Sequence, residues 1–267
     1  MRSARGVTLI ELIVVIAITG IIAAATAFFI RNSMEGYVDA TRRAALTDIA
    51  DTAMRRMTRD LRSALPNSVR VATIGSVTYL EYLQTSGGGR YRAETTIGGP
   101  PPDPLDFAAA DNAFDVIGPM PVFAGGESIV IYNLASVGGT ANAYVGDNRA
   151  AYAGNTATTI TLSPAFKFPF VSPGKRFQVV QYPVTYECNP NAGVQLLRRY
   201  WGYPITATQP TPPVGGSNAP LATNVSACTF TYTSVTQRLG VVALNLQVSS
   251  SGESVTLFQQ VHINNVP

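Results

Sequence analysis

The sequence predicts an α+β protein in which one long N-terminal helix packs on a C-terminal antiparallel β domain. The first 65 residues contain no proline, and from Leu46 onward their apolar residues recur at helical spacing. After Pro66 the pattern changes to short runs of alternating apolar and polar residues, which Gly, Pro and Asn clusters separate. Such runs are typical of strands joined by turns.

The helix begins with an apolar stretch over residues 7–30, whose 24 residues carry no charge except Glu11. At 1.5 Å per residue it reaches about 36 Å, more than the ~30 Å hydrocarbon core of a bilayer. Arg2 and Arg5 precede it, so the positive-inside rule predicts a cytoplasmic N-terminus and export of the rest of the chain. A cut after Gly6 would lie before the apolar stretch, unlike that of a secretory signal, and would leave the stretch in place.

Glu11 is the unusual residue of this stretch. A carboxylate inside a membrane helix costs roughly 2.5 to 3.5 kcal/mol on insertion scales, and it usually marks a functional partner. A cut after Gly6 would create an α-amino group at Val7, about one helical turn before Glu11. That amine could come from the same chain or from a neighbouring one. The alternative is a carboxylate that lies near the lipid headgroups without a partner.

Residues 31–65 continue the helix into water as an amphipathic segment. One face is apolar, and the other mixes Arg and Asp so that i,i+4 pairs such as Asp51 with Arg55 can form. We interpret the charged face as solvated or as paired between subunits. Pro66 should end the helix. The predicted organisation is therefore a leader over 1–6, a membrane helix over 7–30, an amphipathic helix over 31–65 and a β domain over 66–267.

The β domain should begin with a hairpin, in which Ser68–Ile74 and Val77–Leu83 flank a two-residue turn. Residues 84–128 hold so many Gly and Pro residues that we expect an irregular segment, and Thr206–Ala219 should be a surface connection. The later predicted strands are Ser128–Leu134, Thr158–Leu162, Arg176–Glu187, Val194–Tyr203, Val225–Thr233, Gly240–Ser249 and Ser254–Val266, of which the third and fourth, and the last two, form hairpins.

Two cysteines, Cys188 and Cys228, fall in the exported part, where oxidation is permitted. We predict that they pair, closing a loop of about 40 residues that stabilises the fold by up to roughly 4 kcal/mol on the chain-entropy model. This disulfide should attach the Thr206–Ala219 excursion to the sheet. Trp201, with Tyr200 and Tyr203, either packs in the core, which we favour, or stacks on a sugar.

Composition argues against a nucleic-acid partner and against catalysis. The net charge is +3, only two Lys accompany 17 Arg, and no block of like charges is present. His262 is the one histidine, which leaves no credible zinc site or Ser-His-Asp triad. A cluster of four carboxylates suggests a calcium-binding site, but it lacks EF-hand spacing and fits a solvated loop better. Its members are Asp103, Asp106, Asp111 and Asp115. We expect no enzyme activity, no metal and no cofactor.

The segment Gly6–Leu12, GVTLIEL, resembles the processing and methylation motif of type IV pilins and type II secretion pseudopilins. The resemblance implies the type IV pilin fold and a prepilin peptidase that cuts after Gly6 and N-methylates Val7. It also implies that Glu11 is needed for filament assembly. Val7 departs from the usual phenylalanine, and no proline interrupts the apolar helix, although Gly20 lies where a helix-weakening glycine is common.

Three later segments, Arg198–Pro204, Val225–Cys228 and Gln260–Pro267, resemble MshO-type minor pilins of the mannose-sensitive haemagglutinin pilus, relatives of PilW-type minor pilins and J-type pseudopilins. This likeness implies a minor pilin that helps to initiate or cap a pilus. It would be held in the bacterial inner membrane, with its C-terminal domain in the periplasm, and would assemble with other minor and major pilins and the assembly machinery. The alternatives are a secretion pseudopilin, a tip adhesin that binds a ligand through residues 84–128 or the Trp201 hairpin, and a membrane-tethered enzyme, which we disfavour.

Overall fold

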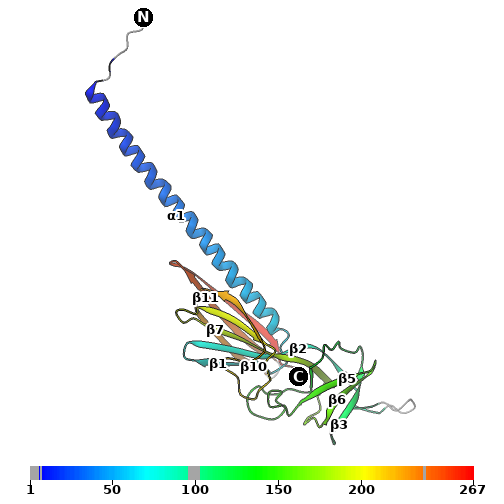
Figure 1. The fold of residues 1–267 in the computed structure, drawn as a ribbon. Helices are drawn as coiled ribbons and strands as arrows, with labels where there is room; N and C mark the ends of the chain where they lie inside the picture. The colour runs from blue at the N-terminus through cyan, green and yellow to red at the C-terminus, as the bar shows by residue number, and fades with distance from the viewer. Residues whose placement is uncertain (1–5, 7, 96–102, 237–238) are drawn as a thin grey trace.

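A long helix with a β domain at its C-terminal end makes up the computed structural model (Figure 1). The model describes residues 6, 8–95, 103–236 and 239–267, and only the backbone of residues 32–33 and 235–236. The helix α1 (Leu9–Leu61) is 53 residues long, and its upper half extends away from the β domain. The predicted α+β architecture is confirmed.

The helix ends at Leu61, four residues before the predicted end at residue 65. Leu65 donates its N–H to the Leu83 carbonyl at 2.8 Å, and Ala64 forms a β-bridge with Gln84. The chain therefore leaves the helix before Pro66 because its backbone pairs with a neighbouring strand, which supplies the hydrogen bonds that a further helical turn would have made.

Twelve strands follow among the described residues. They are β1 (Arg70–Ile74), β2 (Val77–Tyr91), β3 (Asp111–Ile117), β4 (Ser128–Val130), β5 (Arg149–Asn155), β6 (Thr159–Phe166), β7 (Arg176–Asn189), β8 (Leu196–Trp201), β9 (Ser217–Thr223), β10 (Val225–Thr236), β11 (Leu239–Ser250) and β12 (Glu253–Asn264). The predicted hairpins β1–β2, β7–β8 and β11–β12 are confirmed as antiparallel pairs.

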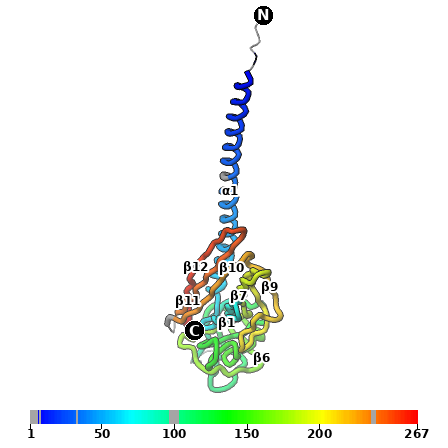
Figure 2. Tube along the Cα trace, turned by 90° about the vertical axis from the view of Figure 1, so that its left-hand side faces the viewer, coloured from blue at the N-terminus to red at the C-terminus, as the bar shows by residue number. Residues whose placement is uncertain are grey.

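The strands form two sheets that enclose the lower half of α1. Nine strands pair in the order β1-β2-β3-β6-β5-β4-β7-β8-β9, and the last three pair as β10-β11-β12. The buried helix face runs from Leu46 to Leu61 and packs against apolar side chains of both sheets, such as Tyr82 and Val184 on one and Leu244 on the other. Figure 2 shows the three-stranded sheet lying alongside the helix. The shared core makes the lower helix part of the domain.

Six strands of the larger sheet close into a ring, because β2 pairs with β7 as well as with β3. The order around this six-stranded ring is β2-β3-β6-β5-β4-β7. It encloses a second core that includes Tyr91, Phe114, Phe168 and Phe177, with Phe114 and Phe177 packed edge to face at 5.6 Å. In Figures 1 and 2 the ring lies at the end of the molecule opposite the N-terminus.

The prediction that residues 84–128 are irregular is wrong for much of that segment. β2 runs through Gly87, Gly88 and Gly89 to Tyr91, and β3 occupies Asp111–Ile117, while 96–102 lies outside the described residues. A Cβ on Gly88 would lie 2.7 Å from the Phe177 carbonyl oxygen. The glycines, which the sequence analysis treated as strand breakers, let β7 approach β2 closely enough to close the ring.

Two other strands also depart from the predictions. β5 falls in a stretch for which we predicted no strand, and β9 extends from within the expected Thr206–Ala219 connection to Thr223. β9 contains Pro220, which has no N–H to donate, and it pairs only with β8 at the edge of the sheet. Proline is tolerated on an edge strand because the missing hydrogen bond would have pointed to solvent.

The predicted disulfide between Cys188 and Cys228 is present, with a Cα–Cα distance of 6.4 Å. It connects β7 of the larger sheet to β10 of the smaller one. The Pro-rich segment after Tyr203 lies within the closed loop, but the bridge itself links the two sheets, which differs from the predicted attachment of that segment. The bridge therefore stabilises the packing of the sheets around α1.

The close contact at Gly88 predicts a stability difference between adjacent glycines of one strand. Gly88→Ala should lower the free energy of unfolding by about 1–3 kcal/mol, because the added methyl group meets backbone. Gly87→Ala is the matched control, since the nearest atom to its Cβ is at 3.7 Å, and it should unfold like the parent. Denaturant unfolding of both full-length variants in detergent measures the difference. Equal stabilities would contradict the steric explanation for the triplet.

Candidate functional site

The N-terminal end of α1 is organised by Thr8 and Glu11. Thr8 is the N-cap residue, and its hydroxyl oxygen accepts a hydrogen bond from the Glu11 backbone N–H at 3.3 Å. Glu11 lies in the first turn, where the helix dipole favours negative charge. The Thr-x-x-Glu spacing is that of a capping box, a signal that our sequence analysis missed.

The predicted processing residues lie just before this cap. Gly6 is exposed, and Val7 lies outside the described residues. The helix thus begins three residues after Gly6, with Thr8 extended at φ −80° and ψ 151°. Gly6 is therefore in a non-helical segment, and the Glu11 side chain is exposed and makes no hydrogen bond or ion pair with another described residue.

The upper half of α1 is an apolar rod without a protein partner in the single chain. Every side chain described between Leu9 and Val38 is exposed, including Leu9, Ile21 and Phe29. The most apolar part of α1 is not buried at all within the chain. Among the described residues, α1 is the one helix long and apolar enough to cross a membrane. A surface this apolar requires lipid or neighbouring helices to cover it.

A family model described as the prokaryotic N-terminal methylation motif matches residues 1–27. This N-terminus is of the prepilin type. The match supports a type IV pilin-like protein, in agreement with the cap, the exposed Gly6 and the apolar rod. It covers about a tenth of the chain. No curated protein and no solved structure matches the chain significantly.

The prepilin-type motif implies processing by a prepilin peptidase and assembly with other pilins. Together with the apolar helix, it fits an inner-membrane anchor for the C-terminal domain. The arrangement at the N-terminus can therefore do two things: present a cleavable segment next to a membrane helix, and place one carboxylate in the first turn of that helix.

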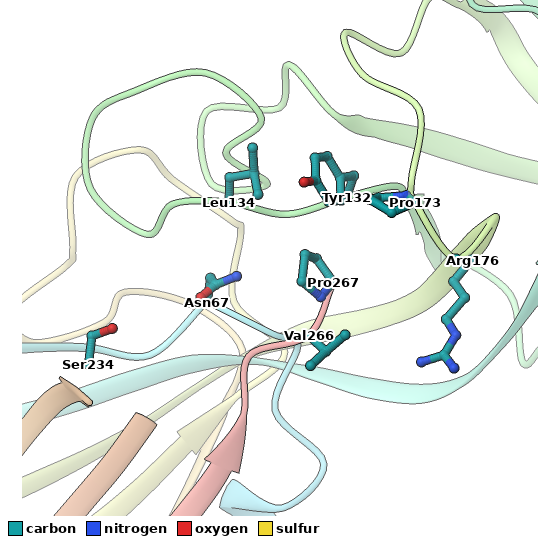
Figure 3. A pocket seen from close by; sticks show the side chains of 9 residues that line it. Asn67, Tyr132, Leu134, Pro173, Arg176, Ser234, Val266 and Pro267 are labelled. Carbon is teal, nitrogen blue, oxygen red and sulfur yellow. The ribbon is translucent and has the colours of Figure 1, made fainter. Parts of the chain in front are cut away.

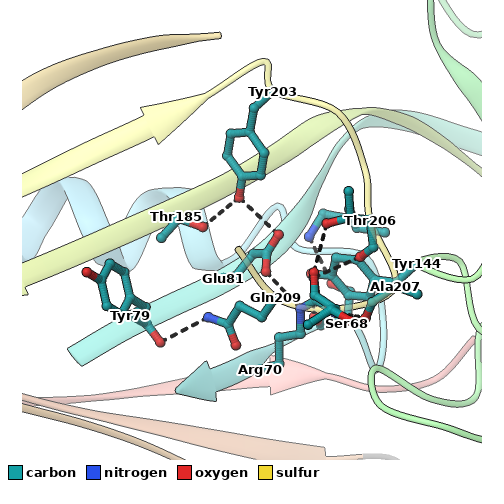
Figure 4. A network of polar contacts seen from close by, with 12 residues as sticks. Ser68, Arg70, Tyr79, Glu81, Tyr144, Thr185, Tyr203, Thr206, Ala207 and Gln209 are labelled. Atoms are coloured by element: carbon teal, nitrogen blue, oxygen red, sulfur yellow. Dashed lines mark hydrogen bonds and ion pairs between the residues drawn. The ribbon is translucent and has the colours of Figure 1, made fainter. Parts of the chain in front are cut away.

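The polar interior of the domain contains a buried ion pair, which Figure 4 shows. Arg70 Nε lies 2.8 Å from Glu81 Oε2, and their side chains are 3% and 0% exposed. Tyr203 donates to the other Glu81 oxygen at 3.0 Å, and Arg70 also donates to the carbonyls of Thr206 and Ala207. Burial raises the pKa of Glu81, and Arg70 offsets only part of this effect. The network attaches the segment after β8 to the first hairpin.

A second polar cluster joins α1 to the larger sheet around Asp60. Its carboxylate accepts from Arg199 Nε at 2.8 Å and from the Tyr186 hydroxyl at 2.7 Å, and it pairs with Arg56 at 3.0 Å. Burial, followed by the nearby Asp60 charge, raises the pKa of Tyr186 above its ordinary range. The helix face that we interpreted as solvated or paired between subunits therefore contributes one carboxylate to the interior of the domain.

The predicted pair of Asp51 with Arg55 is present on the exposed side of α1, with 2.6 Å between Arg55 Nε and an Asp51 oxygen. Another helix arginine, Arg43, holds Glu253 at the β11–β12 turn through two nitrogens at 2.8 and 3.0 Å. This second contact fixes the tip of the three-stranded sheet to the helix.

Three carboxylates of the predicted 103–115 cluster, those of Asp106, Asp111 and Asp115, accept hydrogen bonds from the local backbone. Asp115 accepts from the Asp103 N–H at 3.1 Å, and Asp111 accepts from the Asp106 N–H at 2.8 Å. Within the described ranges, no group of three or more His, Cys, Asp and Glu side chains is placed to hold a metal ion. His262 is exposed on β12.

A cavity of about 700 Å³ lies between the ring and the three-stranded sheet (Figure 3). Its lining includes Asn67, Tyr132 and Arg176, and Arg176 is the one charged side chain among the described residues that line it. The Asn67 amide donates to the carbonyls of Asn133 and Asn265, so it joins the two parts of the domain. We assign this cavity no chemistry.

Proposed function

We propose that this chain is a minor pilin of the MshO type, a low-copy subunit that helps to initiate, prime or cap a type IV pilus-like filament. The observation that carries the proposal is the exposed apolar half of α1, which begins three residues after Gly6 and carries Glu11 in its first turn. In a filament this half would join a bundle of helices, and Glu11 would pair with the methylated N-terminus of a neighbouring subunit.

The proposal includes an orientation and a set of partners. Arg2 and Arg5 would keep the N-terminus cytoplasmic, and the β domain would lie in the periplasm before assembly. The Cys188–Cys228 bridge supports this orientation because disulfides persist in oxidising compartments. The partners would be prepilin peptidase, other minor and major pilins, and the inner-membrane assembly machinery.

The minor-pilin assignment rests on the three segments that resemble MshO-type proteins. The first covers the end of β8 and the turn after it, the second begins β10, and the third covers the end of β12 and the residues after it. The function we propose is association and not catalysis. A type II secretion pseudopilin shares the N-terminal features, and the neighbouring genes, for a pilus or for a secretin apparatus, would separate the two.

Processing at the N-terminus is the first test of this proposal. In cells with a prepilin peptidase, mass spectrometry should find a chain that begins at Val7 and carries one methyl group on its α-amine. In cells without the peptidase, the same chain should retain residues 1–6. An intact leader in the peptidase-positive strain would contradict the assignment. Gly6→Val should block the cut, whereas Ala4→Val, two residues earlier in the leader, should be processed like the parent.

A further inference from the structure

We propose that a cavity between α1 and the larger sheet binds a carboxylated sugar, an acidic hexose unit of a saccharide. The cavity measures about 550 Å³, within the range of small-molecule sites. Its lining consists of Thr52, Arg56, Gln84, Tyr182, Arg199, Trp201, Ala219, Pro220 and Leu221. In this site Arg56 would take the carboxylate and Trp201 would face the sugar ring.

The floor of the cavity is set by strand register. Gln84 on β2 lies opposite Tyr182 on β7, and Trp201 on β8 lies opposite Val184 one row further along β7. Arg199 is two residues before Trp201 and therefore shares its face of the sheet. α1 covers this floor with Thr52 and Arg56, one helical turn apart. Residues distant in sequence are thus brought to one site by the packing of the helix on the sheet.

The charge of the cavity is unbalanced. Among the described residues, two guanidinium groups and no carboxylate line it, while Asp60 is 8% exposed and pairs with both arginines. The two arginines and the carboxylate that they share therefore carry one excess positive charge. Arg56 uses Nε for Asp60, its side chain is 46% exposed, and its terminal nitrogens make no hydrogen bond or ion pair with another described residue. A guanidinium in this state can receive a carboxylate through two parallel hydrogen bonds.

The other lining groups favour a sugar as the body of the ligand. The Trp201 ring is half-buried, with the Arg199 guanidinium 5.1 Å from its centroid, and Tyr182 and Leu221 add apolar surface. Aromatic rings can pack against the C–H face of a pyranose, and the Gln84 amide and Thr52 hydroxyl can hydrogen-bond to hydroxyl groups. One excess positive charge matches a monoanion such as a uronic acid better than a phosphate, which carries about −1.5 to −2.

Trp201 is the single tryptophan of the chain, so its fluorescence reports directly on this cavity. We would titrate the full-length protein in detergent with galacturonate and with the uncharged galactose. The acidic sugar should change the Trp201 emission at a concentration about tenfold lower than the neutral one, a preference equivalent to one good charged contact. Galactose 6-sulfate separates a requirement for carboxylate from a requirement for any monoanion, and binding as tight as that of galacturonate would overturn the carboxylate assignment.

Adjacent arginines of α1 provide a matched control. Arg56→Gln should remove the tenfold preference for the acidic sugar, whereas Arg55→Gln, whose side chain is 73% exposed and paired with Asp51, should keep it. Unfolding midpoints of both variants show whether the domain remains intact. Equal responses to the acidic and neutral sugars, no response to either, or equal losses in the two variants would overturn the proposal. This titration does not depend on N-terminal processing, so its failure would leave the pilin proposal standing.

Discussion

Replacing Glu11 with alanine should exclude the subunit from assembled filaments while leaving it in the membrane. The exposed carboxylate lies in the first turn of α1, within the otherwise apolar stretch over residues 7–30. Without a cationic partner it costs about 2.5–3.5 kcal/mol, and pairing with a neighbouring N-terminus would recover much of that in the filament alone. A difference of this size corresponds to about a hundredfold in an equilibrium. Quantitative immunoblots of sheared filaments against the membrane fraction measure the ratio.

Glu11→Gln distinguishes charge pairing from helix capping. Gln can still take part in a capping box with Thr8, but it has no charge. If charge pairing drives incorporation, the Gln variant should fail as the Ala variant does. Normal incorporation of Glu11→Gln would assign the residue to capping instead. Glu35→Ala is the control on the same helix, since Glu35 is exposed and pairs with Arg31 one turn away, and it should assemble like the parent.

Removing Arg70 should destabilise the domain by about 3–5 kcal/mol near neutral pH, because it leaves Glu81 charged, buried and unpaired. Denaturant unfolding of Arg70→Met measures the loss. In the parent, burial already raises the pKa of Glu81, so the folded state binds its proton more readily than the unfolded chain does. Stability from this group therefore falls as pH rises from the ordinary Glu pKa through the raised value. Without Arg70 this pH dependence should be steeper.

The double variant Arg70→Met, Glu81→Leu separates the ion pair from its surroundings. With both charges removed, much of the lost stability should return, because an apolar pair carries no desolvation cost. The single variant should become more stable as pH falls, because Glu81 takes up a proton. The double variant should not show this increase in stability, because it has no carboxyl group at position 81. If Arg70→Met unfolds at the parent's denaturant midpoint, the Glu81 carboxylate is solvated and the buried network in Figure 4 is wrong.

The sequence predicts those features whose signals are local. The apolar period of α1, the hairpins around short turns and the Cys188–Cys228 bridge are of this kind. The six-stranded ring is not, because its closure depends on how closely β7 approaches Gly88 and Gly89, and adjacent glycines in a sequence also indicate a flexible loop. Whether adjacent glycines form a strand or a flexible loop is decided here by the packing of β7 against them, which the local sequence does not reveal.

The cavity between α1 and the larger sheet could not be predicted from the sequence for a related reason. Asp60 and Arg56 fit the pattern of a solvated helix face, one turn apart and opposite in charge. Their further partner, Arg199, is 139 residues from Asp60, and β-strand register brings it to the same place. Thr8 is the opposite case, since the Thr-x-x-Glu spacing was readable and indicates where the helix begins.

The sharing of β2 and β7 between the two cores has a mechanical consequence. Along β2, Tyr82 belongs to the helix-packed core and Tyr91 to the ring core, and along β7, Val184 and Phe177 divide in the same way. The two strands pair at twelve positions from Thr78 to Arg90 of β2. A force that pulled the ring away from the helix along the strands would be carried by the continuous backbones of β2 and β7, because both strands belong to both cores. Tension at the distal tip would therefore reach the helix-packed core through these two strands.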